Sequence, residues 1–353
     1  MRRGTFLAHL PVWLVLVFFG AATGASAQVA DAPDRFRTMA LGDTAAIDQA
    51  GLLGEFGGLV VNGDDVPSGM HNTVVRISFR ATPASTRDSV CTGIRLLGRN
   101  VVLTAAHCSC GVLGTYRFVT KETFDKLAPG QPIAGEWRAV RYPARYPGYD
   151  CALPPEAQPG KDLAVFFVFS SDDAEFSRNA DSHKPEDLVR FASMHQVRDA
   201  GDIYLLVAGF GVTETGDLPH VLQQGLIRIG THFCSRGTFG GTACEGFREF
   251  ALGSEGPSGT PFPVDTCNGD SGGPVFWYPP NAVDINGVSF QPPAALVGIT
   301  SRALAVADHL PGMLCGGGGV YTAVGHSAVI DWLWSLGVTV RTVESHKPRP
   351  EPG

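Results

Sequence analysis

Short apolar segments separated by turn residues are the feature that most constrains how this 353-residue chain can fold. From Thr73 onward, segments such as residues 73–79, 163–169 and 203–207 are rich in β-branched and aromatic side chains. Segments of that size and composition are typical of strands rather than helices. The 44 glycines and 25 prolines supply the turns that many short strands require. The pattern predicts an all-β fold.

The composition is typical of a folded chain and does not favour a nucleic-acid partner. Hydrophobic residues make up 44% of the chain and charged residues 17%, which excludes an intrinsically disordered protein. The formal net charge is −7, and no cluster of Lys and Arg follows a path that a phosphate backbone would need. We therefore expect no nucleic-acid partner.

The N-terminus has the pattern of an export signal. Arg2 and Arg3 are followed by an apolar run at residues 6–19, and Ala25-Ser26-Ala27 forms a small-x-small cleavage site. The alternative is a membrane anchor, but the run is short and Pro11 interrupts it. We expect a bacterial-style signal peptide at 1–27, export to the periplasm or the medium, and no stable membrane insertion after its removal.

The remaining chain divides by composition. Residues 28–59 have weak periodicity and are predicted to be a pro-segment, and residues 60–340 form the folded domain. Long polar or Pro/Gly-rich stretches at 142–161, 170–202, 246–264 and 278–293 are predicted to be surface loops. Residues 327–336 place Val329, Ile330, Leu333 and Trp334 at helical spacing, which predicts a C-terminal helix. Residues 341–353 are predicted to be a disordered tail.

Eight cysteines, an even number, fit export to an oxidising compartment. Zinc binding is the competing interpretation. The segment Cys108-Ser109-Cys110 is too tight for paired zinc ligands, and no matching histidine pair follows it. Disulfides are therefore the prediction.

The most specific motif is DTCNGDSGGP at residues 265–274. A serine hydroxyl is a poor nucleophile at neutral pH and needs a base, an exposed position and a site for the oxyanion. Glycines on both sides of Ser271 allow a sharp turn and bring backbone N–H groups close to a substrate carbonyl. The tetrapeptide GDSG alone is also compatible with an ordinary turn, but the full string is far more specific.

Two further segments supply a base and a carboxylate. His107 follows an apolar strand in LTAAHC (103–108), where small neighbours and Cys108 would fix the imidazole as a general base requires. Asp162 stands immediately before an apolar strand and is expected to be at least partly buried. A buried carboxylate needs hydrogen bonds, and an imidazole N–H is a suitable donor.

In this order, the three segments resemble the trypsin/chymotrypsin family of serine proteases. The resemblance runs from about Val60 to Leu336 and includes four further matches: VVNG at 60–63, AGFG at 208–211, LVGI at 296–299 and GVYT at 319–322. It implies two six-stranded antiparallel Greek-key β-barrels, followed by the C-terminal helix. It also implies a serine endopeptidase that hydrolyses peptide bonds through an acyl-enzyme.

The resemblance assigns roles to individual residues. Ser271 would be the nucleophile, His107 the general base and acid, and Asp162 the group that orients His107. The N–H groups of Gly269 and Ser271 would form the oxyanion hole. A freed amine at Val60 would pair with Asp270 to activate the enzyme, although Val60 is also compatible with an ordinary strand in a chain that needs no activation. Leu59 stands where many members have Arg or Lys, which argues against activation by a trypsin-like enzyme.

The resemblance also implies three disulfides, Cys91–Cys108, Cys234–Cys244 and Cys267–Cys315. Cys110 and Cys151 match no family position and are paired because they are what remains.

Substrate preference depends on Asp265, which stands at the base of the primary pocket in the family. A carboxylate there favours Arg or Lys at the cleaved position, and the alternative is a solvated loop aspartate. Ser301, Ala303 and Gly319 would line the pocket. After Ser301 the family usually has Trp-Gly, whereas this chain has Arg302 and Ala303. Arg302 would then compete for Asp265 or repel a cationic side chain, and Ala303 would narrow the entrance.

Two other functions are compatible with parts of the pattern. One is a catalytically silent member of the family that binds a protein partner. The other is an esterase on an α/β sheet, which requires a helix after Ser271, but the segment 274–277 is strand-like. The chemistry requires no metal or organic cofactor, and a structural calcium stays open. The expected partners are protein or peptide substrates and protein inhibitors, and the expected state is a monomer.

Overall fold

The computed structural model describes eighteen stretches of the chain: residues 60, 63–66, 71–85, 88–96, 101–112, 116–121, 137–138, 140–168, 189–202, 204–212, 221–234, 238–239, 242–253, 264–278, 284–285, 288–289, 294–304 and 315–343. The predicted signal peptide at 1–27 and pro-segment at 28–59 lie outside these residues, as does the tail from 344 onward.

The first sheet is antiparallel and comes from the first half of the described chain. Its strands lie in the order β6-β5-β2-β3-β4-β8-β7. Their bounds are β2 (Val74–Phe79), β3 (Ser89–Leu96), β4 (Val101–Thr104), β5 (Tyr116–Thr120), β6 (Trp137–Arg138), β7 (Val140–Arg145) and β8 (Ala164–Val168).

The second sheet contains a closed six-stranded barrel. Its strands follow the order β15-β10-β11-β14-β19-β18, and a pairing between β15 and β18 closes the ring. Their bounds are β10 (Tyr204–Gly209), β11 (Gln223–Thr231), β14 (Glu249–Gly253), β15 (Pro274–Trp277), β18 (Ala295–Ala303) and β19 (Gly318–Ala323). Three short strands extend this sheet. β1 (Asp64–Asp65) pairs with β11, β9 (Arg190–Phe191) pairs in parallel with β18, and β20 (Arg341–Thr342) pairs in parallel with β9.

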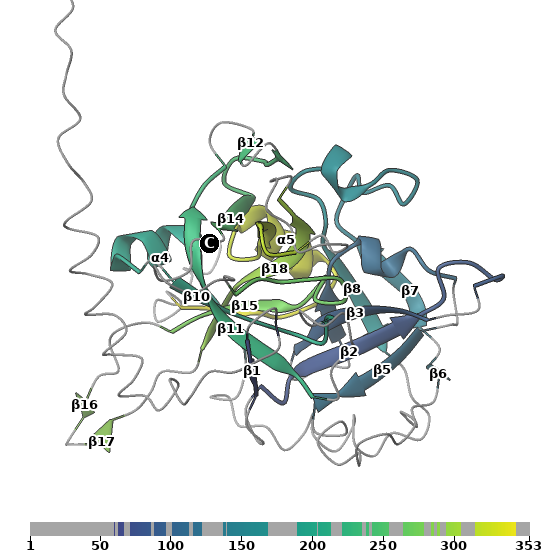
Figure 1. Ribbon diagram of the computed structural model, residues 1–353, viewed down its shortest axis with the longest axis horizontal. Helices are drawn as coiled ribbons and strands as arrows, with labels where there is room; N and C mark the ends of the chain where they lie inside the picture. The colour runs from purple at the N-terminus through teal and green to yellow at the C-terminus, as the bar shows by residue number, and fades with distance from the viewer. Residues whose placement is uncertain are drawn as a thin grey trace, which may run out of the picture. The chain divides into compact units, whose positions relative to one another are not determined.

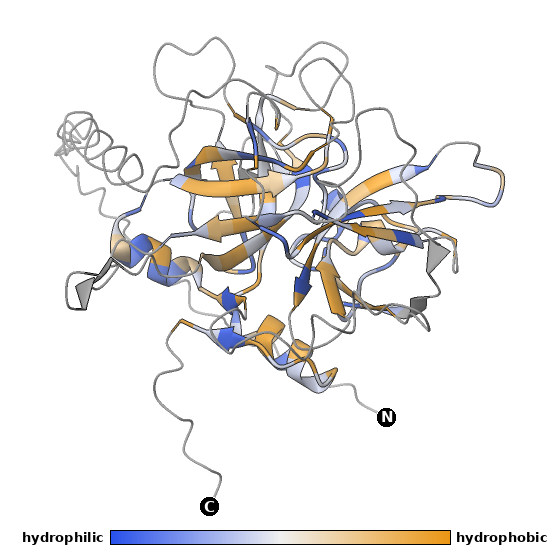
Figure 2. Ribbon diagram, turned by 90° about the horizontal axis from the view of Figure 1, so that it is seen from below, coloured by the Kyte–Doolittle hydropathy of each residue, from blue (hydrophilic) through white to orange (hydrophobic). Residues whose placement is uncertain are grey.

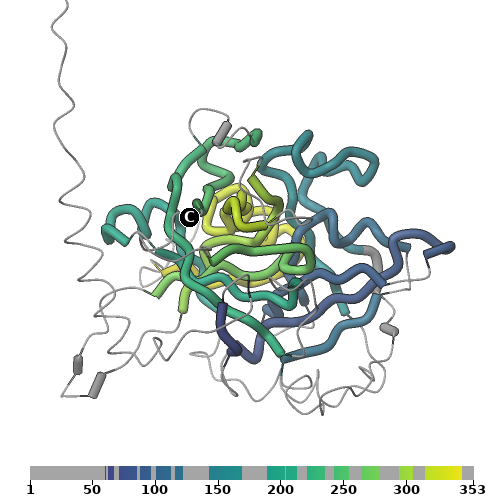
Figure 3. The backbone as a smooth tube through the Cα atoms, in the orientation of Figure 1, coloured from purple at the N-terminus to yellow at the C-terminus, as the bar shows by residue number. Residues whose placement is uncertain are grey.

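Both sheets share one topology. Numbered in chain order within each sheet, and leaving out the short additional strands, the strands follow the order 4-1-2-3-6-5 in both. The order 4-1-2-3 is that of a Greek key. Figures 1 and 3 show the first sheet in purple to teal and the second in green to yellow. The closed barrel, the separate seven-stranded sheet and the small number of helices among the described residues confirm the predicted chymotrypsin-like all-β fold.

Hydrophobic strands form the cores, as the orange strands of Figure 2 show. In the first sheet Phe166 lies 4.9 Å from Tyr116 and 5.3 Å from Phe118, measured between ring centroids. In the barrel, Phe250 stacks on Tyr321 at 5.5 Å. Burial of such rings is the main source of stability in a fold built from short strands.

The C-terminal helix is confirmed as α5 (Ser327–Ser335), with one difference in its buried face. Val329, Ile330 and Leu333 are buried as predicted, but Trp334 is 43% exposed and Trp332 is buried instead. Trp332 packs edge-on against Tyr146, with 5.3 Å between the ring centroids, and this contact covers the face of the helix that carries Trp332.

Every segment predicted to be irregular contains some regular structure. The stretch 142–161 begins within β7 and includes the 3-10 turn η2 (Pro155–Ala157), and the stretch 278–293 includes strand residues at 284–285 and 288–289. The stretch 170–202 includes α4 (Met194–Ala200), which begins with a capping box between Ser193 and Gln196 and ends at the left-handed Gly201. The stretch 246–264 includes β14, an interior strand of the barrel. Arg341 and Thr342 form β20, so the predicted tail is wrong at these two positions, where backbone pairing with β9 orders the chain.

Two small hairpins complete the described elements: β12 (Thr238–Phe239) with β13 (Thr242–Ala243), and β16 (Asp284–Ile285) with β17 (Val288–Ser289). Within the described part of the chain, neither helix is long and apolar enough to cross a membrane.

Candidate active site

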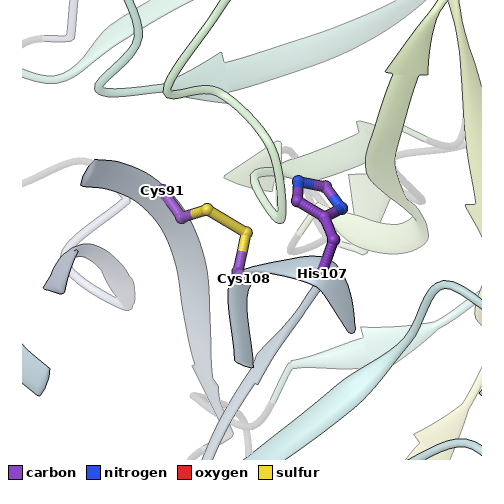
Figure 4. Close-up of side chains that lie close together, drawn as sticks. All are labelled: Cys91, His107 and Cys108. Carbon is purple, nitrogen blue, oxygen red and sulfur yellow. A yellow bond between two sulfur atoms is a disulfide. The ribbon is translucent and has the colours of Figure 1, made fainter. Parts of the chain in front are cut away.

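His107 begins a 3-10 turn, η1 (His107–Ser109), that follows the buried strand β4. The Cys91–Cys108 disulfide joins β3 to this turn, and Figure 4 shows the imidazole beside it. A second disulfide, Cys110–Cys151, joins the end of the turn to the segment that leads to Asp162. Covalent links on both sides restrict how far the imidazole can move.

An arginine also supports the turn. Arg145 donates from Nε to the Ser109 hydroxyl and from Nη2 to the Ser109 carbonyl, both at 2.7 Å. The Ser109 hydroxyl in turn donates to Ala106 O at 2.6 Å. Charge-assisted bonds of this kind are stronger than neutral ones, so β7 holds the histidine turn from a third side.

Asp162 is completely buried and uses both carboxylate oxygens on the histidine turn. Oδ1 accepts the backbone N–H of His107 at 2.9 Å, and Oδ2 accepts from His107 Nδ1 at 2.9 Å. Oδ2 also accepts from the Ser301 hydroxyl at 2.7 Å. A carboxylate can only accept, so Nδ1 carries the proton and Nε2 of the neutral ring is left as the basic nitrogen.

The pair holds its charges in a buried setting. Burial by itself lowers the pKa of His107, but the charge of Asp162 and the hydrogen bond to it raise that pKa above its usual value. Burial likewise raises the pKa of Asp162, but the charge and bonds of His107 and the bond from Ser301 bring it below its usual value. The imidazole is therefore a stronger base than a free histidine, with an ionised carboxylate behind it.

The loop that carries Ser271 depends on backbone conformations that favour glycine. Gly269 and Gly272 have φ angles of +100° and +82°. The Ser271 carbonyl accepts the N–H of Thr92 at 2.8 Å, and Gly272 N–H donates to Thr300 O at 2.8 Å. The loop is thus bonded to both sheets, through β3 and β18.

Thr92 makes three hydrogen bonds in this region. Besides its N–H bond to Ser271, its hydroxyl donates to Gly269 O and accepts from Phe210 N–H, both at 2.9 Å. Among the described hydrogen bonds, none uses the N–H of Gly269 or of Ser271 as donor. Those two groups are the predicted oxyanion donors.

His107 and Ser271 line one cavity of about 430 Å³. Of the predicted pocket residues, Ser301 and Ala303 line it as well. Asp265 and Gly319 do not; Gly319 lies in β19 as the register partner of Ala303. The other lining residues are Pro155, Glu156, Thr242, Ala243, Thr266, Cys267, Asn268, Thr300, Arg302 and Leu304.

Asp265 directly precedes Thr266 and Cys267, which line this cavity, and has no exposed surface of its own. Its carboxylate accepts the N–H groups of Thr266, Gly316 and Gly318 at 2.7, 2.7 and 2.9 Å. Burial raises its pKa to about 6, and the backbone donors offset only part of that effect. The alternative of a solvated loop aspartate is therefore wrong.

Arg302 does not pair with Asp265, which corrects one of the two expectations for this residue. Its Nη1 lies 2.7 Å from Glu249 Oε1 and its Nη2 lies 3.0 Å from Glu249 Oε2. Both side chains are almost fully buried. β14 and β18 flank β19, and this places Glu249 within reach of Arg302.

Val60 and Asp270, the predicted activation pair, are both buried at 1% exposure. Val60 belongs to the apolar cluster of the barrel. Asp270 accepts the N–H of Gly211 at 2.7 Å and of Cys267 at 2.8 Å. Burial raises its pKa to about 7, and the nearby charge of Asp265 adds to the rise.

All eight cysteines are in disulfides, since Cys234–Cys244 and Cys267–Cys315 complete the set. Cys91, His107 and Cys108 place potential metal-binding atoms within 4.8 Å of one another. Two of those atoms are the sulfurs of one disulfide, which cannot serve as thiolate ligands.

Four residues that the sequence did not single out belong to this site. Thr92 and Arg145 support its loops, Glu249 holds Arg302, and Glu156 lines the cavity from the 3-10 turn η2 (Pro155–Ala157). Only Thr92 carried a signal, because it directly follows a cysteine already assigned to the histidine loop. The other three come together only through folding.

The family model described as Trypsin matches residues 60–332 of the chain. A search among curated proteins found no match.

Replacing Gly272 by alanine should destabilise the protein by about 3 kcal/mol, because a Cβ would overlap the Thr104 hydroxyl and the Thr92 carbonyl and φ is +82°. Gly201→Ala is the matched control, since its φ is +81° but no atom lies within 4 Å of its Cβ. It should cost about 1 kcal/mol. Urea unfolding measures both; equal losses would contradict the role of the contact with β3 and β4.

Proposed function

The chain belongs to the trypsin family and is a trypsin-like serine protease that acts on proteins or peptides; from this premise we propose that it is a secreted endopeptidase with Ser271, His107 and Asp162 as its catalytic triad. The observation that carries the proposal is that His107 and Ser271 line one cavity while Asp162 is bonded to the far nitrogen of the imidazole.

The proposed reaction has two halves. The Ser271 hydroxyl attacks the scissile carbonyl and His107 Nε2 takes its proton, which forms a tetrahedral intermediate. His107 then protonates the leaving amine as the acyl-enzyme forms, and water repeats the sequence to release the acid. Asp162 stays ionised throughout; it holds the proton on Nδ1 and stabilises the imidazolium.

The N–H groups of Gly269 and Ser271 are the proposed donors to the intermediate's oxyanion. Their support is the +100° φ of Gly269 and the Thr92 hydroxyl bond to the Gly269 carbonyl. Donors that are held in place before reaction need no reorganisation as charge develops, and each is worth about 10²–10³ in rate.

Labelling with a fluorophosphonate probe tests the proposal. The exported protein should react, and Ser271→Ala should abolish labelling and lower kcat by roughly 10⁶ because the nucleophile is lost. Ser335→Ala, on the exposed side of α5, is the control and should label as the parent does. A parent that is folded, begins at Val60 and still does not label would favour the silent, protein-binding alternative.

We extend the proposal to a preference for Arg or Lys at the cleaved position. Two observations support it: Arg302 is neutralised by Glu249 rather than by Asp265, and Thr266 and Cys267, the neighbours of Asp265, line the cavity. The preference requires that residues 316–318 give way so that a cationic side chain reaches the Asp265 carboxylate. Charge pairing in a buried site would then discriminate against neutral side chains.

The preference should weaken as pH falls through about 6, the pKa of Asp265. Only the ionised carboxylate attracts a cation, so the ratio of kcat/KM for matched Arg and Leu peptides should fall roughly tenfold from pH 8 to pH 5. Titration of His107 affects both peptides equally and cancels in the ratio. Asp265→Asn should give a low ratio at every pH. Equal turnover of both peptides by the parent at pH 8 would rule the preference out.

Activation by cleavage before Val60 is the third part of the proposal. A buried carboxylate with only backbone donors has a raised pKa, and a freed Val60 amine would give Asp270 the cation that its site lacks. Asp270 directly precedes Ser271, so this pairing would act on the loop that holds the nucleophile and the oxyanion donors.

N-terminal sequencing of the probe-reactive, exported protein should begin at Val60, and Asp270→Asn should be cleaved normally but label slowly. The expected reason is that a neutral amide cannot hold the cationic amine. A fully reactive protein that retains residues before Val60 would contradict activation by cleavage. The same N-terminal sequencing also tests whether the proposed signal peptide is removed. The four disulfides support export, because disulfides persist in oxidising compartments.

A further inference from the structure

Arg302 is a buried cation in the wall of the cavity that contains His107 and Ser271. It lies on β18 directly after Ser301, the residue that bonds Asp162. A buried charge is costly unless it is paired, and Arg302 is paired with the buried carboxylate of Glu249.

The guanidinium uses both terminal nitrogens. Nη1 donates to Glu249 Oε1 at 2.7 Å and to the Ser301 hydroxyl at 3.1 Å. Nη2 donates to Glu249 Oε2 at 3.0 Å and to the Ala243 carbonyl. Glu249 is itself fixed, because its Oε2 also accepts the N–H of Glu245 at 2.8 Å. The arginine is therefore clamped between β14, β13 and its own strand.

The hydrogen bond from Arg302 to the Ser301 hydroxyl determines where that hydroxyl donates its own proton. An arginine N–H can only donate, so the Ser301 oxygen accepts from Arg302. The single Ser301 proton is then directed to Asp162 Oδ2, 2.7 Å away. A chain of hydrogen bonds thus runs from Glu249 through Arg302 and Ser301 to the Asp162–His107 pair.

We propose that Arg302, anchored by Glu249, is a positioning residue for the reaction: through the Ser301 hydroxyl it keeps Asp162 hydrogen-bonded as an ionised acceptor, and its charge sets the basicity of His107. The inference rests on the proposed function for its catalytic meaning. It does not make Arg302 a catalytic residue, because the arginine acts through Ser301.

The charges around His107 support the proposal that the charge of Arg302 affects the basicity of the imidazole. Asp162 and Glu156 raise the pKa of the imidazole, and Arg302 opposes them by lowering it, in addition to the lowering by burial. Among the described residues, the charged and titratable groups on the elements around the histidine turn include Arg145, Tyr146, Tyr149, Asp150, Glu156, Lys161, Asp162, Arg302 and, behind Arg302, Glu249; of these, Asp162, Glu156 and Arg302 act on the pKa of His107. Because Arg302 and Glu249 have opposite charges, losing either one alone should move the pKa of His107, and in opposite directions.

The test is the acid limb of kcat/KM against pH, which reports His107 in the free enzyme. Arg302→Gln removes a positive charge and should move the limb upward by about half a pH unit; Glu249→Gln leaves Arg302 unbalanced and should move it downward by a similar amount. Arg302→Lys keeps the charge and should restore most of the parent profile. Arg198→Gln, an exposed arginine paired with Asp199 on α4, is the control and should leave the limb unchanged.

Arg302→Gln alone leaves a buried carboxylate unpaired and can fail to fold. The double variant Arg302→Gln/Glu249→Gln removes both charges, and its limb should lie between those of the single variants. If Arg302→Gln does not fold, Glu249→Gln is compared with the double variant. The proposal is overturned if the acid limb of Glu249→Gln does not lie at a lower pH than that of the double variant. Shifts of the same sign in all variants also overturn it.

A readout without turnover separates this inference from the proposed function. In full-length protein carrying Ser271→Ala, NMR titration of the His107 imidazole should show the same opposite shifts. If the parent neither labels nor cleaves, the proposed function fails, while the titration still tests Arg302. If the parent is an active enzyme and the titration is identical in both single variants, the proposed function stands and this inference is wrong.

Discussion

A carboxylate with no exposed surface, that of Asp162, is the constraint on which the site depends. Burial alone would neutralise it, so the fold must supply donors to both of its oxygens. One donor is a backbone N–H, which exists only if the turn at His107 has its present conformation. The ionised state of Asp162 and the orientation of the imidazole therefore both depend on the conformation of this turn. Two disulfides and Arg145 hold the turn in that conformation.

The same condition joins the two sheets. Asp162 and His107 come from the first sheet's part of the chain, whereas Ser301 lies in β18 of the barrel and Ser271 in the loop before β15. Thr322 of the barrel donates to the Asp162 carbonyl at 3.3 Å. Thr92 makes the reciprocal link from β3 to the loop of Ser271. Since each sheet provides donors or acceptors that the other needs, the cavity between His107 and Ser271 is defined by polar bonds with strict geometry rather than by apolar packing alone.

The sequence predicts the parts of this structure that depend on local pattern. Strand-sized apolar segments predict the all-β fold, and residues 327–336 predict α5, because periodicity and turn chemistry act over a few neighbours.

The sequence pattern could not predict whether Trp332 or Trp334 is the buried tryptophan of the helix, since this depends on Tyr146, far away in the chain. The helix α4 was predictable in principle, because Ser193 and Gln196 form a capping box, but the surrounding polar residues favoured a loop. The partner of Arg302 was beyond any local rule: Glu249 and Arg302 meet only because β14 and β18 both border β19.

Four buried carboxylates in and beside the barrel show how differently a fold can accommodate one kind of charge. Asp162 has an imidazole and a hydroxyl, and its pKa falls. Glu249 accepts hydrogen bonds from the Arg302 guanidinium at both of its oxygens.

Asp265 and Asp270 differ, because among the described hydrogen bonds their only donors are backbone N–H groups. Their pKa values rise to about 6 and about 7. Backbone dipoles therefore offset only part of the effect of burial at Asp265 and Asp270, whereas the imidazole and the hydroxyl at Asp162 more than offset it. The two aspartates with raised pKa values are also the two for which family resemblance assigns a cationic partner from elsewhere, a substrate side chain in one case and the Val60 amine in the other. Under the proposed function, Asp265 would gain its cation when substrate binds, and Asp270 would gain its cation when the chain is cleaved before Val60.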